Sequence, residues 1–91
     1  MIKIVFDVDG CLIHQIGEKE DTPRHDVIQL FLLLEKFGCD MYIHSGGGLD
    51  YARRWRDKLG LNAKIVEKGS VFADLAFDDE NVKLGKVNIK V

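Results

Sequence analysis

Two short acidic motifs follow apolar runs of the sequence, and their side chains are suited to nucleophilic catalysis. Asp7 and Asp9 follow the first run, and Asp78 and Asp79 follow a later one. An aspartate carboxylate can attack as a nucleophile, and a second carboxylate beside it can act as general acid and base. Because side chains two apart on a strand point the same way, we expect Asp7 and Asp9 to face one pocket. Gly10 then lets the chain turn away.

The four carboxylates would repel one another within one pocket unless a cation lay among them. The two motifs contain no histidine or thiolate, and hard carboxylate oxygens alone favour Mg²⁺. We therefore expect a magnesium site formed by Asp7, Asp9, Asp78 and Asp79. Each motif by itself would also fit a solvated acidic turn, and the combination of the two favours the site.

Two further features can hold the oxygens of a phosphoryl group. Ser45 is followed by three glycines, and its hydroxyl and the amides of Gly46 and Gly47 can bind an anion just before a helix begins. A simple N-cap loop is the alternative. Lys68 can neutralise the nucleophile and the bound phosphate. Lys64 is its rival, but Lys64 falls within a predicted strand, whereas Lys68 lies in the loop beyond it.

An alternation of strands and helices must bring these groups together. Apolar and β-branched runs predict strands over residues 2–8, 41–43, 63–66, 73–77 and, at an edge, 86–91. Apolar stripes predict one helix that begins at Thr22-Pro23 and ends before Gly38, and a second near Leu49 to Leu59. The candidate residues fall at carboxyl ends of strands, where open parallel sheets place their sites. We expect one α/β domain over 1–91, a three-layer Rossmann-like fold with a mainly parallel sheet of about five strands.

The composition fits a soluble globular protein. The chain has 91 residues, of which 46% are hydrophobic and 31% charged, and its net charge of −2 gives no general affinity for polyanions. The longest apolar run is far too short to span a bilayer, and the N-terminus does not read as a signal peptide. We therefore expect a cytoplasmic protein without membrane contact, with Cys11 and Cys39 as reduced thiols.

The ordered motifs resemble those of the haloacid dehalogenase superfamily of phosphohydrolases. The pattern of that family is a hydrophobic strand ending in Asp-x-Asp-Gly, a Ser or Thr after the second strand, a Lys, and a hydrophobic strand ending in two acidic residues. Here these are Ile4–Gly10, Ser45, Lys68 and Leu75–Asp79, and the resemblance covers residues 2–79.

The resemblance implies a magnesium-dependent phosphomonoesterase. Asp7 would be the nucleophile that forms an aspartyl-phosphate, and Asp9 would protonate the leaving group and later activate water. Ser45 and Lys68 would hold the phosphoryl oxygens. The metal would be bound by Asp7, the backbone carbonyl of Asp9 and one residue of the acidic pair 78–79, between which the motif does not decide.

The resemblance also implies the strand order 5-4-1-2-3 and an open active site. In that order the link between the third and fourth strands crosses ~14 Å, and its nine residues reach at most about 26 Å, so no full helix is expected there. The gaps after the first and second strands are too short for a cap domain. Only a flap at Cys11–Asp21, or a partner subunit, would cover the pocket. Cys11 stands where the family usually has Thr.

The substrate stays open among sugar phosphates, nucleotides and phosphorylated nucleic-acid ends, which suit an open site. The cluster Arg53, Arg54 and Arg56 can serve such a substrate, but a solvated helix face is the favoured interpretation. Trp55 is expected in the core or an interface. The apolar helix Val27–Phe37 leaves room for a homo-oligomer.

Two other functions use similar residues. A receiver-type phosphoacceptor module also has a strand-end aspartate, Mg²⁺, a hydroxyl and a lysine, but its adjacent acidic pair ends the first strand, and here the pair ends the fourth. A non-catalytic module would use the same cleft to hold a phosphorylated partner. Asp9, as a second acid and base beside Asp7, favours turnover over both alternatives.

Overall fold

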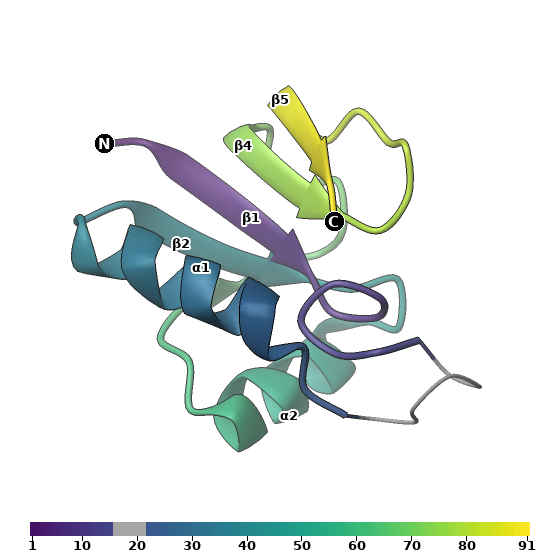
Figure 1. Ribbon diagram of the computed structural model, residues 1–91. Coiled ribbons are helices and arrows are strands. Elements are labelled where there is room, and N and C mark those ends of the chain that lie inside the picture. The colour runs from purple at the N-terminus through teal and green to yellow at the C-terminus, as the bar shows by residue number, and fades with distance from the viewer. Residues whose placement is uncertain (16–21) are drawn as a thin grey trace.

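The structure is a computed structural model that describes residues 1–15 and 22–91 (Figure 1). The described residues form β1 (Lys3–Asp7), α1 (His25–Lys36), β2 (Asp40–His44), α2 (Leu49–Leu59), β3 (Lys64–Ile65), β4 (Ala73–Asp78) and β5 (Gly85–Lys90). The strands make one sheet in the order β3-β2-β1-β4-β5, and every neighbouring pair is parallel. The α/β class, the parallel sheet of five strands and the expected strand order are thereby confirmed.

Both helices pack on the same face of the sheet (Figure 1). On that face Phe6 of β1 lies between Phe77 of β4, with ring centroids 4.5 Å apart, and Phe31 of α1, at 5.1 Å. Trp55 of α2, only 8% exposed, belongs to the same core and not to a free surface. This stacking of large side chains against a continuous apolar strand stabilises the position of β1 in the centre of the sheet.

The opposite face of the sheet carries no helix among the described residues. A smaller cluster forms there around Val5 and Tyr42, and it is covered by Val66, Val71 and Leu84 from the connections on either side of β4. The described chain therefore has two layers of secondary structure where three were expected. The physical reason is length, because the segment between β3 and β4 must cross the sheet and has no residues left for a helix.

The start of α1 differs from the sequence-based prediction. Arg24 is the N-cap and its side chain makes no capping bond, whereas Thr22 and Pro23 lie before the helix. Pro23 instead pairs with Ile13 in an isolated antiparallel bridge. The predicted helix start at Thr22-Pro23 was wrong because the pairing of Pro23 with another part of the chain overrode the local helix-start signal.

The expected flap at Cys11–Asp21 is described only in part. The His14 N–H donates to the Thr22 carbonyl at 2.8 Å, and the Arg24 N–H donates to the Leu12 carbonyl at 2.9 Å, so the two ends of this segment are joined. Residues 16–21 lie outside the described residues, and the flap stays a prediction.

The remaining elements follow the sequence pattern closely. The second helix runs over Leu49–Leu59 as predicted, and Gly60 ends it with a left-handed φ of 69°. The link over 66–72 contains no helix, as expected. Over residues 1–15 and 22–91, no helix has both the length and the apolar character needed to cross a bilayer.

Candidate functional site

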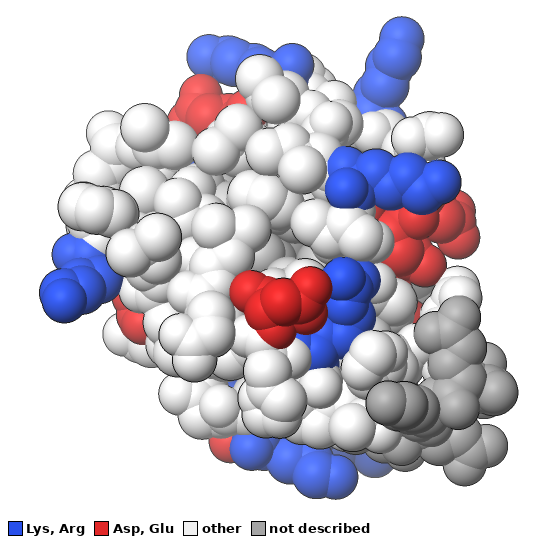
Figure 2. All heavy atoms as spheres, in the orientation of Figure 1, with Lys and Arg blue, Asp and Glu red and all other residues white. Residues whose placement is uncertain are grey.

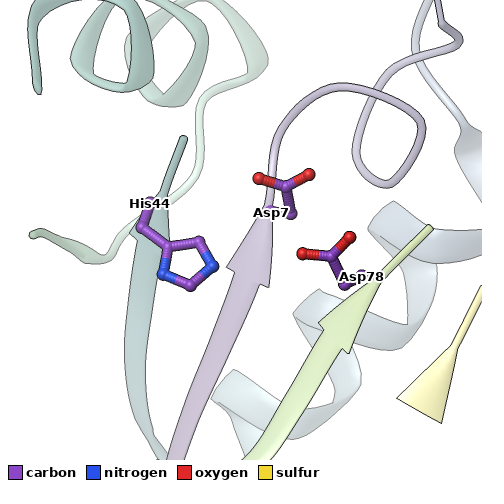
Figure 3. A group of neighbouring side chains, drawn as sticks. All are labelled: Asp7, His44 and Asp78. Atoms are coloured by element: carbon purple, nitrogen blue, oxygen red, sulfur yellow. The ribbon is translucent and has the colours of Figure 1, made fainter. Parts of the chain in front are cut away.

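Three neighbouring strands end with polar side chains that lie in one row. Asp7 ends β1 and is paired in register with His44, which ends β2. Phe6 is paired with Phe77, so Asp78 at the end of β4 comes level with Asp7 on the other side. Figure 3 shows the three side chains turned toward one another from the three strands. The parallel register thus brings Asp7 and Asp78, 71 residues apart in the chain, to one point.

Lys68 completes this row from the link between β3 and β4. Its Nζ lies 3.4 Å from Asp7 Oδ1 and 3.2 Å from Asp78 Oδ2, so one ammonium bridges both carboxylates. Lys64, the rival candidate, pairs with Asp40 at 3.3 Å, and Asp40 lies at the start of β2, away from the strand ends. The geometry therefore places Lys68, and not Lys64, beside Asp7.

Burial makes Asp7 a weaker acid than an ordinary aspartate. The residue is only 4% exposed. Burial first, and then the negative charge of Asp78, raise the pKa of Asp7 from 3.8 to about 7, although Lys68 opposes the shift. Burial lowers the pKa of Lys68, but the two carboxylates outweigh it and the net shift is upward. When Asp7 is ionised, the two carboxylates carry more negative charge than Lys68 compensates, so a second cation would favour the ionised form.

His44 is the residue of this row that sequence reasoning missed. Its side chain is 1% exposed, and neither ring nitrogen has a hydrogen-bond partner among the described residues. Burial, followed by the charge of Lys68, lowers the pKa of His44 from 6.5 to about 4, so the ring is neutral. The only sequence signal was its place, two residues after the buried Tyr42 and directly before Ser45.

His44 adds an imidazole to the carboxylates that the sequence analysis proposed as metal ligands. Ligand atoms of Asp7, His44 and Asp78 all lie within 4.8 Å of one another, so this group can hold a metal ion. A set of two carboxylates and an imidazole also suits Zn²⁺ or Mn²⁺. The donor types by themselves therefore do not single out Mg²⁺.

A cleft of about 540 Å³ opens at the strand ends above this row. It is lined by Asp7, Asp9, Gln15, Gly46, Gly47, Lys68, Asp79 and Glu80. Most of the predicted site residues thus share one cavity, and the prediction that Asp7 and Asp9 face a single pocket is confirmed. Asp78 does not line this cleft, although its carboxylate is the acidic group that Lys68 joins to Asp7.

The loop after β2 presents its glycines to the cleft and turns its serine inward. Ser45 is 4% exposed, and its Oγ accepts a 3.0 Å hydrogen bond from the Gly47 N–H. Ser45 does not line the cleft, whereas Gly46 and Gly47 do. A Cβ at Gly47 would come within 3.0 Å of the Tyr51 ring, so a side chain fits poorly at that position. Ser45 therefore braces the loop whose backbone borders the cavity.

Tyr51 of α2 holds the second aspartate. Its hydroxyl donates a 2.6 Å hydrogen bond to Asp9 Oδ1. Asp9 is half-buried and lines the cleft, so this bond fixes one oxygen of a carboxylate that borders the cavity. Sequence reasoning did not find Tyr51, because a tyrosine in an amphipathic helix gives no signal of its own.

The turn after Asp9 is fixed by close packing. Gly10 has a left-handed φ of 74°, and a Cβ there would overlap the Asp79 carboxylate. Arg24 Nη1 donates to the Gly10 carbonyl at 2.8 Å, and Gln15 Nε2 donates to Asp79 Oδ2 at 3.1 Å. Only glycine satisfies both the backbone conformation and the approach of Asp79. The Gly in the Asp-x-Asp-Gly motif is thus what lets the two acidic motifs meet.

Cys11 follows this turn and is fully buried. Its Sγ donates to the Phe77 carbonyl at 3.6 Å, and burial raises the pKa of the thiol. The residue therefore packs between β1 and β4 as a small apolar group and is a poor nucleophile.

Comparisons of this chain with protein-family models, with curated proteins and with solved structures found no significant match.

Proposed function

We propose that the protein is a magnesium-dependent phosphomonoesterase of the haloacid dehalogenase type, with Asp7 as the nucleophile that forms an aspartyl-phosphate. The observation that carries the proposal is the buried Asp7 at a strand end, bridged by Lys68 to Asp78 and sharing its cleft with Asp9. A nucleophile, an acid and base, and a fixed positive charge are the groups that phosphoryl transfer uses. The substrate is a phosphorylated small molecule, a nucleotide or a phosphorylated nucleic-acid end.

The acidic groups fit a divalent cation. Lys68 contacts Asp7 Oδ1 and Asp78 Oδ2, and Asp78 Oδ1 accepts a 3.0 Å hydrogen bond from the Glu80 N–H. A metal ion would therefore share the carboxylate oxygens of Asp78 with Lys68 and this amide. The raised pKa of Asp7 means that ionising it is costly until another positive charge arrives. Asp7, Asp78 and the backbone carbonyl of Asp9 would hold Mg²⁺, with Asp79 at the outer edge of the cleft. When bound, the ion would neutralise the charge of the phosphoryl oxygens.

The chain's own residues account for the remaining steps. A carboxylate oxygen of Asp7 attacks phosphorus, the bond to the leaving oxygen breaks, and Asp9 gives that oxygen its proton. Asp9, now ionised, takes a proton from water, which attacks phosphorus and releases phosphate from Asp7. Tyr51 keeps the carboxylate of Asp9 oriented through its 2.6 Å hydrogen bond. Lys68 and the amide of Gly46 at the cleft stabilise the phosphoryl oxygens, while the Gly47 N–H is held by Ser45 Oγ.

Asp9 is also the residue that favours turnover over a phosphoacceptor switch. A switch preserves its acyl phosphate, whereas a carboxylate held beside the nucleophile in the same cleft is placed to activate water. An aspartyl-phosphate that persists for minutes would support the switch instead.

The test is phosphate release from p-nitrophenyl phosphate and from a panel of sugar phosphates, nucleotides and phosphorylated oligonucleotides. Release should require Mg²⁺ and fall by at least about a thousandfold in Asp7→Asn, because the nucleophile is lost. Asp50→Asn is the matched control, since Asp50 is exposed on α2 and pairs only with Arg53 in the described chain. Full turnover by a clean Asp7→Asn preparation would remove the mechanism.

The choice between the two residues of the acidic pair is tested with the metal alone. Calorimetric titration with Mg²⁺ should show no binding to Asp78→Asn and only weakened binding to Asp79→Asn, because Asp78 lies level with Asp7 and Asp79 lies at the rim. The reverse order of effects would assign the metal to Asp79.

A further inference from the structure

A groove on α2 lies next to the candidate active site and is built from aromatic and basic side chains. Its volume is about 290 Å³, and it is lined by Tyr51, Arg54, Trp55 and Lys58. Figure 2 shows Lys and Arg side chains gathered along the lower edge of the molecule, where Figure 1 places α2. The groove combines flat apolar walls with positive charge, a combination that suits nucleic-acid strands.

The four basic residues of α2 divide into two pairs of different character. Arg53 pairs with Asp50 at 2.9 Å, and Arg56 pairs with Asp57 at 2.9 Å and donates to the Ala63 carbonyl at 3.2 Å. These two guanidinium groups are already compensated within the protein. Arg53 is exposed, as expected of a solvated helix face, whereas Arg56 is half-buried against the segment after α2.

Arg54 and Lys58 have a different environment. Within the described part of the chain neither makes an ion pair. The Arg54 guanidinium lies 5.9 Å from the centre of the Tyr51 ring, and Lys58 Nζ lies 4.7 Å from the centre of the Trp55 ring. Contact with an aromatic face orients a cation without cancelling its charge. Both positive charges thus remain available to an external anion.

Tyr51 connects the groove to the cleft. Its ring is part of the groove, and its hydroxyl bonds to Asp9 inside the cleft. The same ring lies beneath Gly47, which lines the cleft. Among the described residues, Tyr51 therefore joins the groove to the cleft that would hold the phosphate of a substrate.

We propose that this groove binds the backbone adjoining the terminal phosphate of a single-stranded nucleic acid. The inference rests on the proposed function, since it assumes that the terminal phosphate lies in the cleft. A small sugar phosphate has one phosphate and leaves nothing for Arg54 and Lys58 to bind. These residues are four apart, about 6 Å along the helix axis, so they can contact neighbouring phosphates of one strand. Trp55 belongs to the core, so the half-buried Tyr51 ring is the aromatic group of the groove that can contact a base.

Binding is measured with Asp7→Asn protein, which cannot turn over, and a fluorescent oligonucleotide carrying a terminal phosphate, in the presence of Mg²⁺. Arg54→Gln/Lys58→Gln should weaken binding at least tenfold. If the groove makes two phosphate contacts, the slope of the logarithm of the binding constant against the logarithm of the salt concentration should be about 1.4 steeper for the parent than for this double variant. The control is Arg53→Gln/Lys36→Gln, which removes the same charge outside the groove and should bind as tightly as the parent. Circular dichroism checks that all three proteins fold.

Three outcomes would overturn the inference. Equal weakening by the two double variants would mean general attraction to charge, and a duplex that binds as tightly as the single strand would mean a different nucleic-acid surface. An acidic phosphopeptide that binds as tightly as the oligonucleotide and depends equally on Arg54 and Lys58 would mean a peptide site.

Turnover separates this inference from the proposed function. In the wild-type background, Arg54→Gln/Lys58→Gln should lower kcat/KM for the phosphorylated oligonucleotide at least tenfold relative to p-nitrophenyl phosphate. If small phosphates are hydrolysed but the ratio of the two kcat/KM values does not change, the role of the groove is wrong and the proposed phosphatase activity stands. Groove-dependent binding of the oligonucleotide with no hydrolysis of any phosphate would overturn the phosphatase and leave the groove.

Discussion

At the scale of single residues, the chemistry depends on how burial changes two neighbouring side chains. Asp7 and His44 are paired in register, and both are almost completely buried. Burial, and then the charge of Asp78, raise the pKa of Asp7 to about 7, and burial lowers the pKa of His44 to about 4. Both shifts favour the neutral form, so without a metal ion the site is adjusted to carry as little charge as possible.

These two residues contribute to stability with opposite dependence on pH. Between pH 3.8 and about 7, folded Asp7 binds a proton that the unfolded chain has lost, so its contribution falls as the pH rises. Between about pH 4 and pH 6.5, unfolded His44 binds a proton that the folded chain lacks, so its contribution rises with pH. In the metal-free protein the two slopes oppose each other over nearly the same range.

Removing the histidine should expose the slope due to Asp7. Metal-free His44→Leu is expected to lose on the order of 3 kcal/mol of its free energy of unfolding between about pH 4 and about pH 7, whereas the wild-type curve changes much less. Urea unfolding at intervals across this range measures both curves. Parallel curves for the two proteins would contradict the opposing roles of Asp7 and His44.

Tyr51 gives a second prediction at this scale. Tyr51→Phe removes only the hydroxyl that donates to Asp9 Oδ1 at 2.6 Å. Loss of this orientation should lower kcat by about tenfold to a hundredfold and change the pH profile of kcat, because Asp9 is the proposed acid and base. KM for p-nitrophenyl phosphate should change little. An unchanged kcat and pH profile would mean that the hydrogen bond is structural only.

At the scale of elements, the strand ends could be predicted from the sequence and their surroundings could not. The apolar runs before Asp7 and Asp78 determine central strands, and parallel pairing then brings their ends together. His44 could not be found in this way, because its role follows from the register of β1 and β2. Pro23 was misplaced for a similar reason, since its partner Ile13 lies across a connection and not in the helix.

The link between β3 and β4 is the element on which the electrostatics depend. It has no helix, and it crosses the face opposite α1 and α2 to deliver Lys68 between Asp7 and Asp78. Because the link is short and must cross the sheet, it brings the side chain of Lys68 to the strand ends.

Replacing Lys68 tests the role of this link. Lys68→Met should lower kcat by about a hundredfold or more, and should destabilise the metal-free protein by about 2 kcal/mol, because two buried carboxylates lose their shared partner. Lys64→Met is the control, since Lys64 pairs with Asp40 far from the cleft, and its activity should equal that of the wild type. Steady-state kinetics and urea unfolding measure both effects. Equal activity of the two variants would remove Lys68 from the site.

At the scale of the whole molecule, the part of the chain that the structure describes leaves the strand ends open. The described residues contain no second domain over the strand ends, and the cleft is bordered by loops after β1, β2 and β4 together with Lys68. If the proposed function is correct, the surface beside the cleft is where the described residues would distinguish substrates. The groove on α2 is the part of that surface where uncompensated positive charge and aromatic side chains occur together.

The most direct test of the proposed chemistry is to trap the covalent intermediate. Wild-type protein is mixed with a phosphorylated substrate and Mg²⁺ and quenched with borohydride, which reduces an acyl phosphate to an alcohol. Mass spectrometry of peptides then identifies the reduced residue. Reduction at Asp7 that requires both substrate and Mg²⁺ is the predicted result. Reduction elsewhere, or none during rapid phosphate release, would contradict an aspartyl-phosphate at Asp7.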